Sequence, residues 1–165
     1  MKVLIAISKL KFKIVSCGRD IDAFARAPLW EGGQDFAHGT GHGVGHYLSV
    51  HEGPHRISKF SNVAFKEGMI VSNEPGFYHE GKFGIRIENL ILVQKSEMEP
   101  SNSFLEFENL SFVPIDRRLI SVRLLNEHEI EWINNYHLQC WEKVHNKVDT
   151  KTQAWLENMT KPIEK

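Results

Sequence analysis

Cysteine is scarce in this sequence, which contains only Cys17 and Cys140 among its 165 residues. Two thiols so far apart provide neither a disulfide framework nor a cysteine-based zinc site. We expect both to be ordinary thiols in a reducing cytoplasm. Long apolar runs are also missing, because no stretch reaches the roughly 18 residues that a membrane span needs. These absences argue against a disulfide-stabilised secreted scaffold and predict no membrane partner.

Neither sign of charge dominates, because 20 Lys and Arg residues oppose 21 Asp and Glu residues, giving a net charge of -1 and a pI near 6.8. This balance argues against a polyanion-binding surface over the whole protein, so we predict no nucleic-acid partner. An export signal is missing too. Residues 14–17 could pass for a lipoprotein cleavage box, but Lys9, Lys11 and Lys13 interrupt the apolar region of about 7–15 residues that an export signal needs. We therefore expect a cytoplasmic protein.

The N-terminal half mixes expected helices with short strands. Apolar residues at helical spacing predict a helix over residues 2–12. This helix lacks a visible N-cap, which leads us to suspect that a preceding segment is absent. A second helix is expected over 19–27, with Asp20 and Asp22 as capping residues. Runs of strand-forming residues predict strands at 47–51, 69–72 and 85–93, and a hairpin tip at 77–84.

The C-terminal part is expected to contain a polar linker, two strands and two helical segments, at 97–103, 104–114, 119–122, 126–148 and 152–159. The longer helix is the clearest in the chain, because Asn126 and Glu129 stand at the positions of a capping box. Its apolar stripe predicts core packing, so we assign no chemistry to His137 or His145. The order of elements predicts an α+β fold.

The chemistry of the chain concentrates in residues 38–54, where four histidines stand among glycines. Imidazoles bind metals or move protons near neutral pH, since their unperturbed pKa is about 6.5. Glycine admits backbone conformations with positive φ and close approach by a ligand. We therefore expect this segment to form the floor of a site. A histidine-rich zinc-storage segment on an unrelated fold is the alternative.

Two carboxylates extend this candidate site. Pro75 and Gly76 force a turn that leaves Glu74 at a strand end, and Glu88 shares a strand face with Arg86. One imidazole, from His42, and two bridging carboxylates suit divalent ions such as Mn²⁺, Co²⁺ or Zn²⁺. A pair of such ions activates water for hydrolysis. Taken alone, the strand with Arg86 and Glu88 also fits a solvated edge strand with a surface ion pair.

Three motifs in this region resemble the cytosolic-type Xaa-Pro aminopeptidases, members of the pita-bread metallopeptidases that include prolidase and methionine aminopeptidase. The motifs are HGTGHGVGHYLSVHEGP at 38–54, EGMIVSNEPGFY at 67–78 and FGIRIENLILV at 83–93. The resemblance continues through 18–30 and 124–137, and so covers nearly the whole chain. It implies a partial pita-bread (creatinase/aminopeptidase-like) fold, with an antiparallel sheet, helices and a C-terminal helical extension.

The same resemblance implies a division of the chain. Residues 1–96 match the C-terminal part of the pita-bread catalytic domain. Residues 97–165 match the end of the catalytic sheet and the helical extension, and a homodimer through this part is consistent with the family. The implied cofactor is a pair of Mn²⁺ ions, or Co²⁺ or Zn²⁺. The implied substrate is a peptide with proline at its second position.

The metal roles are implied position by position. His42 matches the imidazole ligand of one ion, Glu74 matches a carboxylate on that ion that also acts as general base, and Glu88 matches the carboxylate that bridges both ions. Arg86 resembles a residue that holds the metal-binding carboxylates.

The substrate pocket is implied in the same way. His38 and His51 match histidines that line it and stabilise or relay charge at the scissile bond, while Tyr78 matches a pocket-lining aromatic residue. His46 stands where relatives carry a smaller residue and stays unassigned. We expect His55 and His79 to face solvent.

The chain departs from the family in its aspartates. The family's site also uses two aspartates about ten residues apart and a further pocket histidine, and none of the five aspartates here has that spacing. They are Asp20, Asp22, Asp35, Asp116 and Asp149. We therefore expect a truncated or split-gene product that is inactive alone. The alternatives are weak hydrolysis at one metal, activity when a separate N-terminal half completes the site, and a non-catalytic binding module.

Overall fold

A computed structural model of the chain describes residues 1–47, 49–97 and 103–165. Their contacts divide them into two compact units, one of residues 3–111 with Met1 and the other of residues 112–165 with Lys2. Leu48, within one expected strand, and residues 98–102, within the expected polar linker, lie outside the described part.

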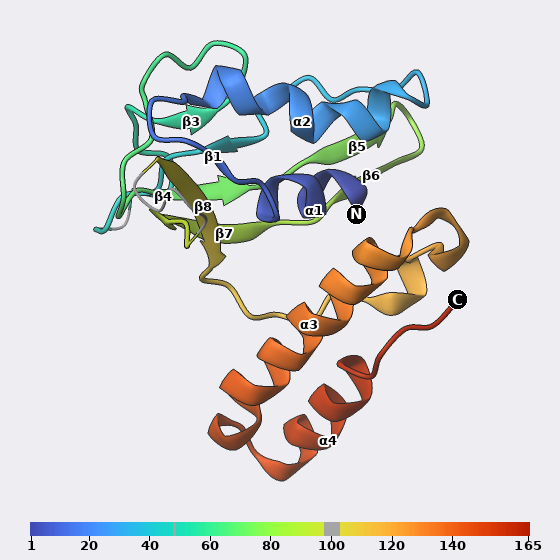
Figure 1. Cartoon of the computed structure of the whole chain (residues 1–165). Helices are drawn as coiled ribbons and strands as arrows, with labels where there is room; N and C mark the ends of the chain where they lie inside the picture. Colours follow the sequence, from blue (N-terminus) through green and yellow to red (C-terminus); the bar gives the residue numbers. More distant parts are fainter. Residues whose placement is uncertain (48, 98–102) are drawn as a thin grey trace. The chain divides into compact units, whose positions relative to one another are not determined.

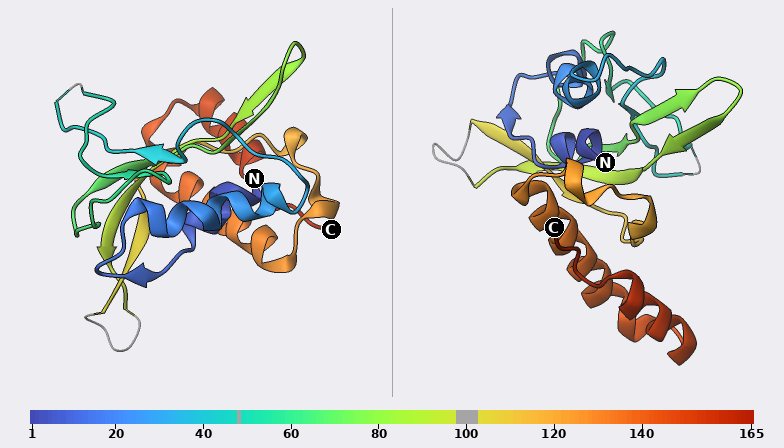
Figure 2. Two further views of the ribbon diagram at one scale, coloured as in Figure 1. Left: turned by 90° about the horizontal axis from the view of Figure 1, so that it is seen from above. Right: turned by 90° about the vertical axis from the view of Figure 1, so that its right-hand side faces the viewer.

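The first unit is a mixed α/β structure in which helices cover an antiparallel sheet. Its elements are α1 (Lys2–Ser8), β1 (Phe12–Lys13), α2 (Gly18–Trp30), β2 (Gly41–His42), β3 (Arg56–Ile57), β4 (Ile70–Asn73), β5 (Gly76–His79), β6 (Phe83–Arg86), β7 (Asn89–Lys95) and β8 (Phe104–Asn109). The main sheet has the strand order β1-β8-β7-β4, while β2 pairs with β3 and β5 with β6. Figure 1 shows α1 and α2 on the same side of this sheet, and Figure 2 shows the β5–β6 hairpin extending away from it. The predicted α+β class is confirmed.

A single apolar cluster joins the helices of this unit to the sheet. Phe12, Phe65 and Phe107 pack with ring centroids 5.0–5.9 Å apart, within the range of favourable aromatic pairs. Along β7, the side chains of Asn89, Ile91 and Val93 are buried in alternation, so they share one face of the strand. This packing fixes β4 and β7, which flank the candidate site.

The helix expected over 2–12 ends at Ser8, which corrects the sequence-based boundary. Phe12 instead pairs with Leu105 across the sheet and is buried. The strand expected over 85–93 is divided into β6 and β7 at residues 87–88. The reason is a change of partner, because β6 pairs only with β5 whereas β7 pairs with β4 and β8.

The strand expected at 47–51 is wrong for the described residues 47 and 49–51, which form bends and loops. Backbone hydrogen bonds there link loop to loop, as when Glu52 N–H donates to the carbonyl of Gly43 at 2.9 Å. The strand of the histidine segment is the shorter β2, paired with β3. The expected strand at 69–72 and the hairpin tip at 77–84 are confirmed as β4 and the β5–β6 hairpin.

The start of α2 confirms one of two expected caps. Asp20 Oδ2 accepts the backbone N–H of Cys17 at 2.8 Å, and this hydrogen bond lowers the pKa of the Asp20 carboxyl. Asp22 is not a cap, because it is buried and bonds to Arg26 and Thr40. Arg26 lies one helical turn after Asp22, so the two form an i,i+4 ion pair, and the Asp22 carboxylate is used for this pair and not for capping.

The second unit is helical. It contains the 3₁₀ turns η1 (Arg117–Leu119) and η2 (Val122–Leu124), the helix α3 (Glu127–Val144), the turn η3 (His145–Lys147) and the helix α4 (Thr150–Met159). The capping box at Asn126 and Glu129 is confirmed by reciprocal hydrogen bonds of 2.8 and 2.9 Å. Figure 1 shows α3 and α4 as an antiparallel pair.

The strands expected beyond residue 109 are wrong. β8 ends at Asn109, and Leu119 lies in η1 rather than in a strand. Pro114 has no backbone N–H to continue a ladder. Asp116 then accepts the N–H of Arg118 at 3.0 Å, which starts a turn instead.

Both cysteines are free, as the sequence predicts, and both are buried. Burial raises the pKa of the Cys140 thiol to about 11, so this thiol stays protonated at neutral pH. Within the described residues, no helix has both the length and the apolar character to cross a membrane.

Candidate metal centre

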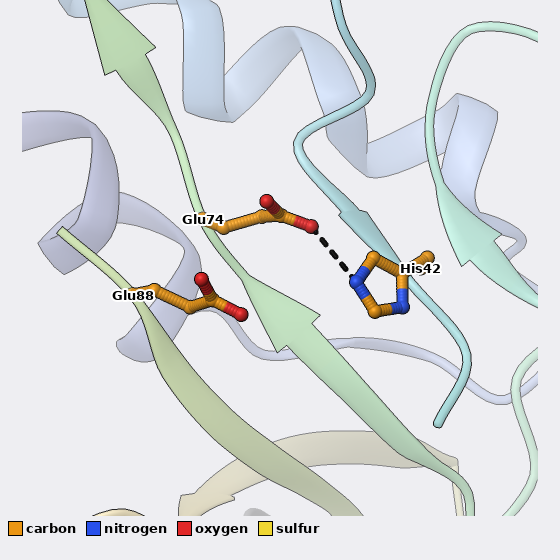
Figure 3. A group of neighbouring side chains, drawn as sticks. All are labelled: His42, Glu74 and Glu88. Carbon is orange, nitrogen blue, oxygen red and sulfur yellow. Dashed lines mark ion pairs between the residues drawn. The ribbon is translucent and has the colours of Figure 1, made fainter. Parts of the chain in front are cut away.

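Three predicted ligands converge in the first unit. His42 ends β2, Glu74 directly follows β4, and Glu88 lies between β6 and β7. One ligand atom from each residue lies within 4.8 Å of those of the other two. Figure 3 shows the imidazole and both carboxylates pointing into the same space. The structure thus brings together all three residues that the resemblance assigns to the metal.

Gly41 allows β2 to lie against β4. A Cβ atom at this position would overlap the backbone carbonyl oxygen of Ser72 in β4. Glycine therefore permits a close approach that any side chain would prevent. The contact is extended by the backbone N–H of Glu74, which donates to the carbonyl of Thr40 at 2.8 Å. In this way the sequence places His42 beside Glu74.

Ser72 ties these two ligands together. Its side chain is fully buried, and its hydroxyl oxygen accepts the backbone N–H of His42 at 2.9 Å. The same hydroxyl donates to Glu74 Oε1 at 3.0 Å. Sequence reasoning missed Ser72. The available signal was the period of two along a strand, which puts Ser72 and Glu74 on one face.

The contacts of the two ring nitrogens of His42 indicate whether the three residues could hold a cation. Its Nδ1 lies 2.9 Å from the carbonyl oxygen of Gly43, which can only accept, so Nδ1 carries the proton. The other ring nitrogen, Nε2, lies 3.0 Å from Glu74 Oε1. Two acceptors at that distance repel each other unless a proton or a metal ion lies between them. The donor set, one imidazole and two carboxylates, fits a divalent ion.

Arg86 links the metal group to the predicted pocket residues. Its Nη1 lies 3.4 Å from Glu74 Oε2, and its Nε and Nη2 donate to the Tyr78 hydroxyl at 3.0 and 2.8 Å. The hydrogen bond to Tyr78, followed by the charges of Glu74 and Glu88, raises the pKa of Arg86. A permanently charged guanidinium beside two carboxylates reduces their mutual repulsion.

His38 reaches the same tyrosine from the other side. Its Nδ1 donates to the carbonyl of Gly39 at 2.8 Å, which leaves Nε2 as acceptor for the Tyr78 hydroxyl at 2.7 Å. The ring of His51 is exposed and lies 4.2 Å, centroid to centroid, from the ring of His42. His51 therefore lies beside His42, whereas His38 is connected to Glu74 only through Tyr78 and Arg86.

The remaining histidines of this region differ from one another. His79 is exposed, as predicted, and His46 is exposed as well. His55 corrects the prediction that it faces solvent, because it is half-buried and its Nε2 lies 2.9 Å from the carbonyl oxygen of Ile70. The close contact of Gly43 with the segment before His55 draws this ring inward.

The aspartates are all engaged elsewhere. Asp22 and Asp35 both pair with Arg26. The other three, Asp20, Asp116 and Asp149, accept backbone N–H groups at the starts of helices or turns. Among the residues that the structure describes, the group that could hold a metal ion therefore consists of His42, Glu74 and Glu88.

Residues 2–95 match the sequence profile of metallopeptidase family M24, and residues 103–163 match that of the C-terminal region of peptidase M24. The chain belongs to metallopeptidase family M24. A Laccaria bicolor protein named "Probable Xaa-Pro aminopeptidase P" is 48% identical over 169 residues, which cover 96% of this chain and 26% of that protein. Aminopeptidase P2 of Arabidopsis thaliana is 46% identical, covering 98% of this chain and 24% of its own length.

Solved structures place the M24 chain in the same fold. The X-prolyl aminopeptidase of Caenorhabditis elegans, described as a cytosolic enzyme with a di-nuclear active site, matches with a TM-score of 0.91 and 38% identity. The match covers 98% of this chain and 27% of that one. The prolidase of Pyrococcus furiosus matches with a TM-score of 0.54 and 31% identity over 66% of this chain and 29% of its own.

These matches confirm the predicted family and the partial pita-bread fold with its C-terminal helices. The chain is homologous to the C-terminal part of Xaa-Pro aminopeptidases. It spans about a quarter of the length of the curated relatives it matches.

Proposed function

We propose that this chain binds a divalent metal ion through His42, Glu74 and Glu88 and does not hydrolyse peptides on its own. The observation that carries this proposal is the convergence of one imidazole and two carboxylates, with His42 Nε2 only 3.0 Å from Glu74 Oε1. The inactivity follows from the donor set, because none of the chain's aspartates adjoins the three ligands. Within the described part of the chain, no further carboxylate, histidine or cysteine joins the group to hold a second ion.

Each ligand has a distinct part in the proposed site. A bound divalent ion lowers the pKa of a coordinated water and polarises a peptide carbonyl. His42 would hold the ion through Nε2, because its Nδ1 is directed at the carbonyl of Gly43. Glu74 would hold the ion and act as general base by taking up a proton at its carboxylate, and Glu88 would supply the second carboxylate that holds metal. Arg86 places a positive charge beside Glu74, with Nη1 3.4 Å from Oε2.

The pocket residues act on the substrate. We propose that His38 and His51 stabilise charge at the scissile bond of a peptide with proline at its second position. The Tyr78 hydroxyl, held by Arg86, orients the His38 ring. Mn²⁺ is the ion we propose first, with Co²⁺ or Zn²⁺ as substitutes, because one imidazole and two carboxylates accept all three.

The homology supports further proposals on organisation. We assign residues 1–96 to the catalytic domain and 97–165 to the end of its sheet and the helical extension, with a homodimer formed through the latter part. A cytoplasmic location is consistent with the description of the C. elegans enzyme as cytosolic.

Activity on complementation by a separate polypeptide is the second candidate. Every residue of β6 is exposed, including Phe83 and Ile85, which are 52% and 47% accessible. Arg86 and Tyr78, which belong to the proposed pocket, lie on this same hairpin. An exposed strand with apolar side chains offers a surface for another chain to pair with. A partner that supplied two aspartates there would complete the site.

Calorimetric titration of the purified chain with Mn²⁺, combined with an assay of Xaa-Pro peptide cleavage, tests the main proposal. We expect one bound ion per chain, loss of binding in His42→Ala and Glu74→Gln, and no turnover. Glu67→Gln is the matched control, because this exposed glutamate pairs with Lys95 away from the site. Absence of Mn²⁺ binding would refute the metal site. Turnover that disappears in Glu74→Gln would refute the proposed inactivity.

A further inference from the structure

Arg26 of α2 is a buried charge outside the metal group. Its side chain is only 9% exposed, yet it donates four hydrogen bonds of 2.7–2.8 Å. The acceptors are Asp22 Oδ2, Asp35 Oδ1 and the backbone carbonyls of Phe36 and His38. The guanidinium also lies 4.1 Å from the centre of the Phe36 ring. A buried charge with this many partners is held in one geometry.

Through its hydrogen bonds to two backbone carbonyls, Arg26 of α2 holds the start of the histidine segment. Phe36 and His38 lie in the irregular backbone before β2, where no strand ladder holds their carbonyl groups. A planar guanidinium presents several N–H donors in a fixed fork, which a lysine ammonium cannot do. Arg26 therefore fixes the backbone conformation of residues 36–38.

Asp22 and Thr40 link Arg26 to the backbone of Glu74 through a series of hydrogen bonds. While Oδ2 of Asp22 accepts from Arg26, its Oδ1 accepts the hydroxyl of Thr40 at 2.6 Å. Thr40 is fully buried, and its carbonyl accepts the backbone N–H of Glu74 at 2.8 Å. Continuous hydrogen bonds thus run from α2 through Asp22 and Thr40 to the backbone of a proposed metal ligand. We call Asp22, Arg26 and Thr40 the α2 clamp.

We propose that the α2 clamp positions the residues of the metal site. Arg26 orients His38 for its hydrogen bond with Tyr78, and Thr40 holds Glu74 beside His42. The inference rests on the proposed metal-binding function and adds positioning residues to it. None of the three clamp residues touches the ligand atoms, so they act through the backbone of the residues that do. Outer partners of this kind typically change metal affinity by about 10–100-fold when removed.

A purely structural role would lower stability without changing the site. The distinguishing measurements are the Mn²⁺ affinity of the folded variants and the ¹⁵N signals of the His38 imidazole. In the wild-type chain, His38 carries its proton on Nδ1 and accepts from Tyr78 at Nε2, which gives two well-separated ¹⁵N shifts. Loss of the clamp frees the ring and averages these two shifts.

The variants are Arg26→Lys, which keeps the charge but not the fork, and Thr40→Val, which keeps the shape but not the hydroxyl. We expect Mn²⁺ affinity to fall about 10–100-fold in each, with averaged His38 shifts in Arg26→Lys. Thr40→Ser restores the hydroxyl and should restore affinity. Arg19→Lys, at an exposed position of the same helix, is the control.

Folded Arg26→Lys and Thr40→Val chains with wild-type Mn²⁺ affinity and unchanged His38 shifts would overturn the α2 clamp. If Arg26→Lys does not fold, the Thr40→Val and Thr40→Ser pair still decides the Glu74 half of the inference. A wild-type chain that binds no Mn²⁺ would refute the proposed function instead. The His38 shifts, measured without metal, would still test the clamp in that case.

Discussion

At the scale of single residues, the candidate site depends on two small residues, Gly41 and Ser72, that position the larger side chains of His42 and Glu74. Gly41 leaves room for the carbonyl of Ser72, and the Ser72 hydroxyl contacts both His42 and Glu74. The grouping of His42, Glu74 and Glu88 was predictable because their motifs carry the chemistry in their side chains. Ser72 was not singled out, because a serine in a buried strand has no pattern of its own. Its role appears only when the strands are placed side by side.

Replacement of Ser72 by alanine tests this support. Ser72→Ala removes the donor to Glu74 Oε1 and leaves the N–H of His42 without its acceptor. We expect Mn²⁺ affinity to fall about 10–100-fold and the free energy of unfolding to fall by about 1 kcal/mol. Calorimetry and urea titration measure the two effects. Ser121→Ala is the control, because Ser121 is exposed and its side chain caps nothing. An unchanged Mn²⁺ affinity would show that the hydrogen bond from Ser72 does not position Glu74 for metal binding.

At the scale of elements, prediction succeeded where local rules suffice. The capping box of α3 and the hairpin of β5 and β6 follow from neighbours in the sequence. The strand expected at 119–122 was wrong, because Asp116 starts a turn that apolar spacing does not reveal. The division of 85–93 into β6 and β7 depends on which strands pair, and pairing is a long-range property. That division places Glu88 in the site.

The helix α3 also predicts a dependence of stability on pH. His137 is fully buried, and its Nε2 accepts the backbone N–H of Ile115 at 3.1 Å, so the ring is neutral. Burial, and then the charge of Arg117, lowers the pKa of His137 below its ordinary value of 6.5. The unfolded chain therefore binds more protons than the folded chain as the pH falls below about 6.5. Stability is lost in that window, by at most about 1.4 kcal/mol per pH unit, until the folded pKa is reached.

Urea unfolding of the second unit at pH 7.5 and 5.5 measures this loss. His137→Gln keeps an acceptor near Ile115 but does not titrate, so the difference between the two pH values should shrink. His128→Gln is the control, because the side chain of His128 is 81% exposed. An equal pH dependence in wild type and His137→Gln would assign the effect to other groups.

At the scale of the whole chain, the fold has two compact units, and all three proposed ligands lie in the first. A metal ion that binds only the folded state stabilises it by about 2.7 kcal/mol when free metal is 100-fold above the dissociation constant. This stabilisation should be confined to the unit that holds the ligands. The sequence predicted the ligands and the helical extension. The predicted division between residues 96 and 97 rests on the family resemblance, whereas the contacts divide the chain near residue 111 because of packing within each unit.

Hydrogen exchange with and without Mn²⁺ tests this confinement. We expect the amides of Val71, Ile91 and Val93, in the core of the first unit, to exchange up to about 100-fold more slowly with metal, because they open through global unfolding of that unit. Amides in α3, such as that of Ile133, should not change. Glu74→Gln should abolish the slowing. Equal slowing in α3 would show that the two units unfold together, whereas no slowing in β4 and β7 would show that the metal does not bind where His42, Glu74 and Glu88 meet.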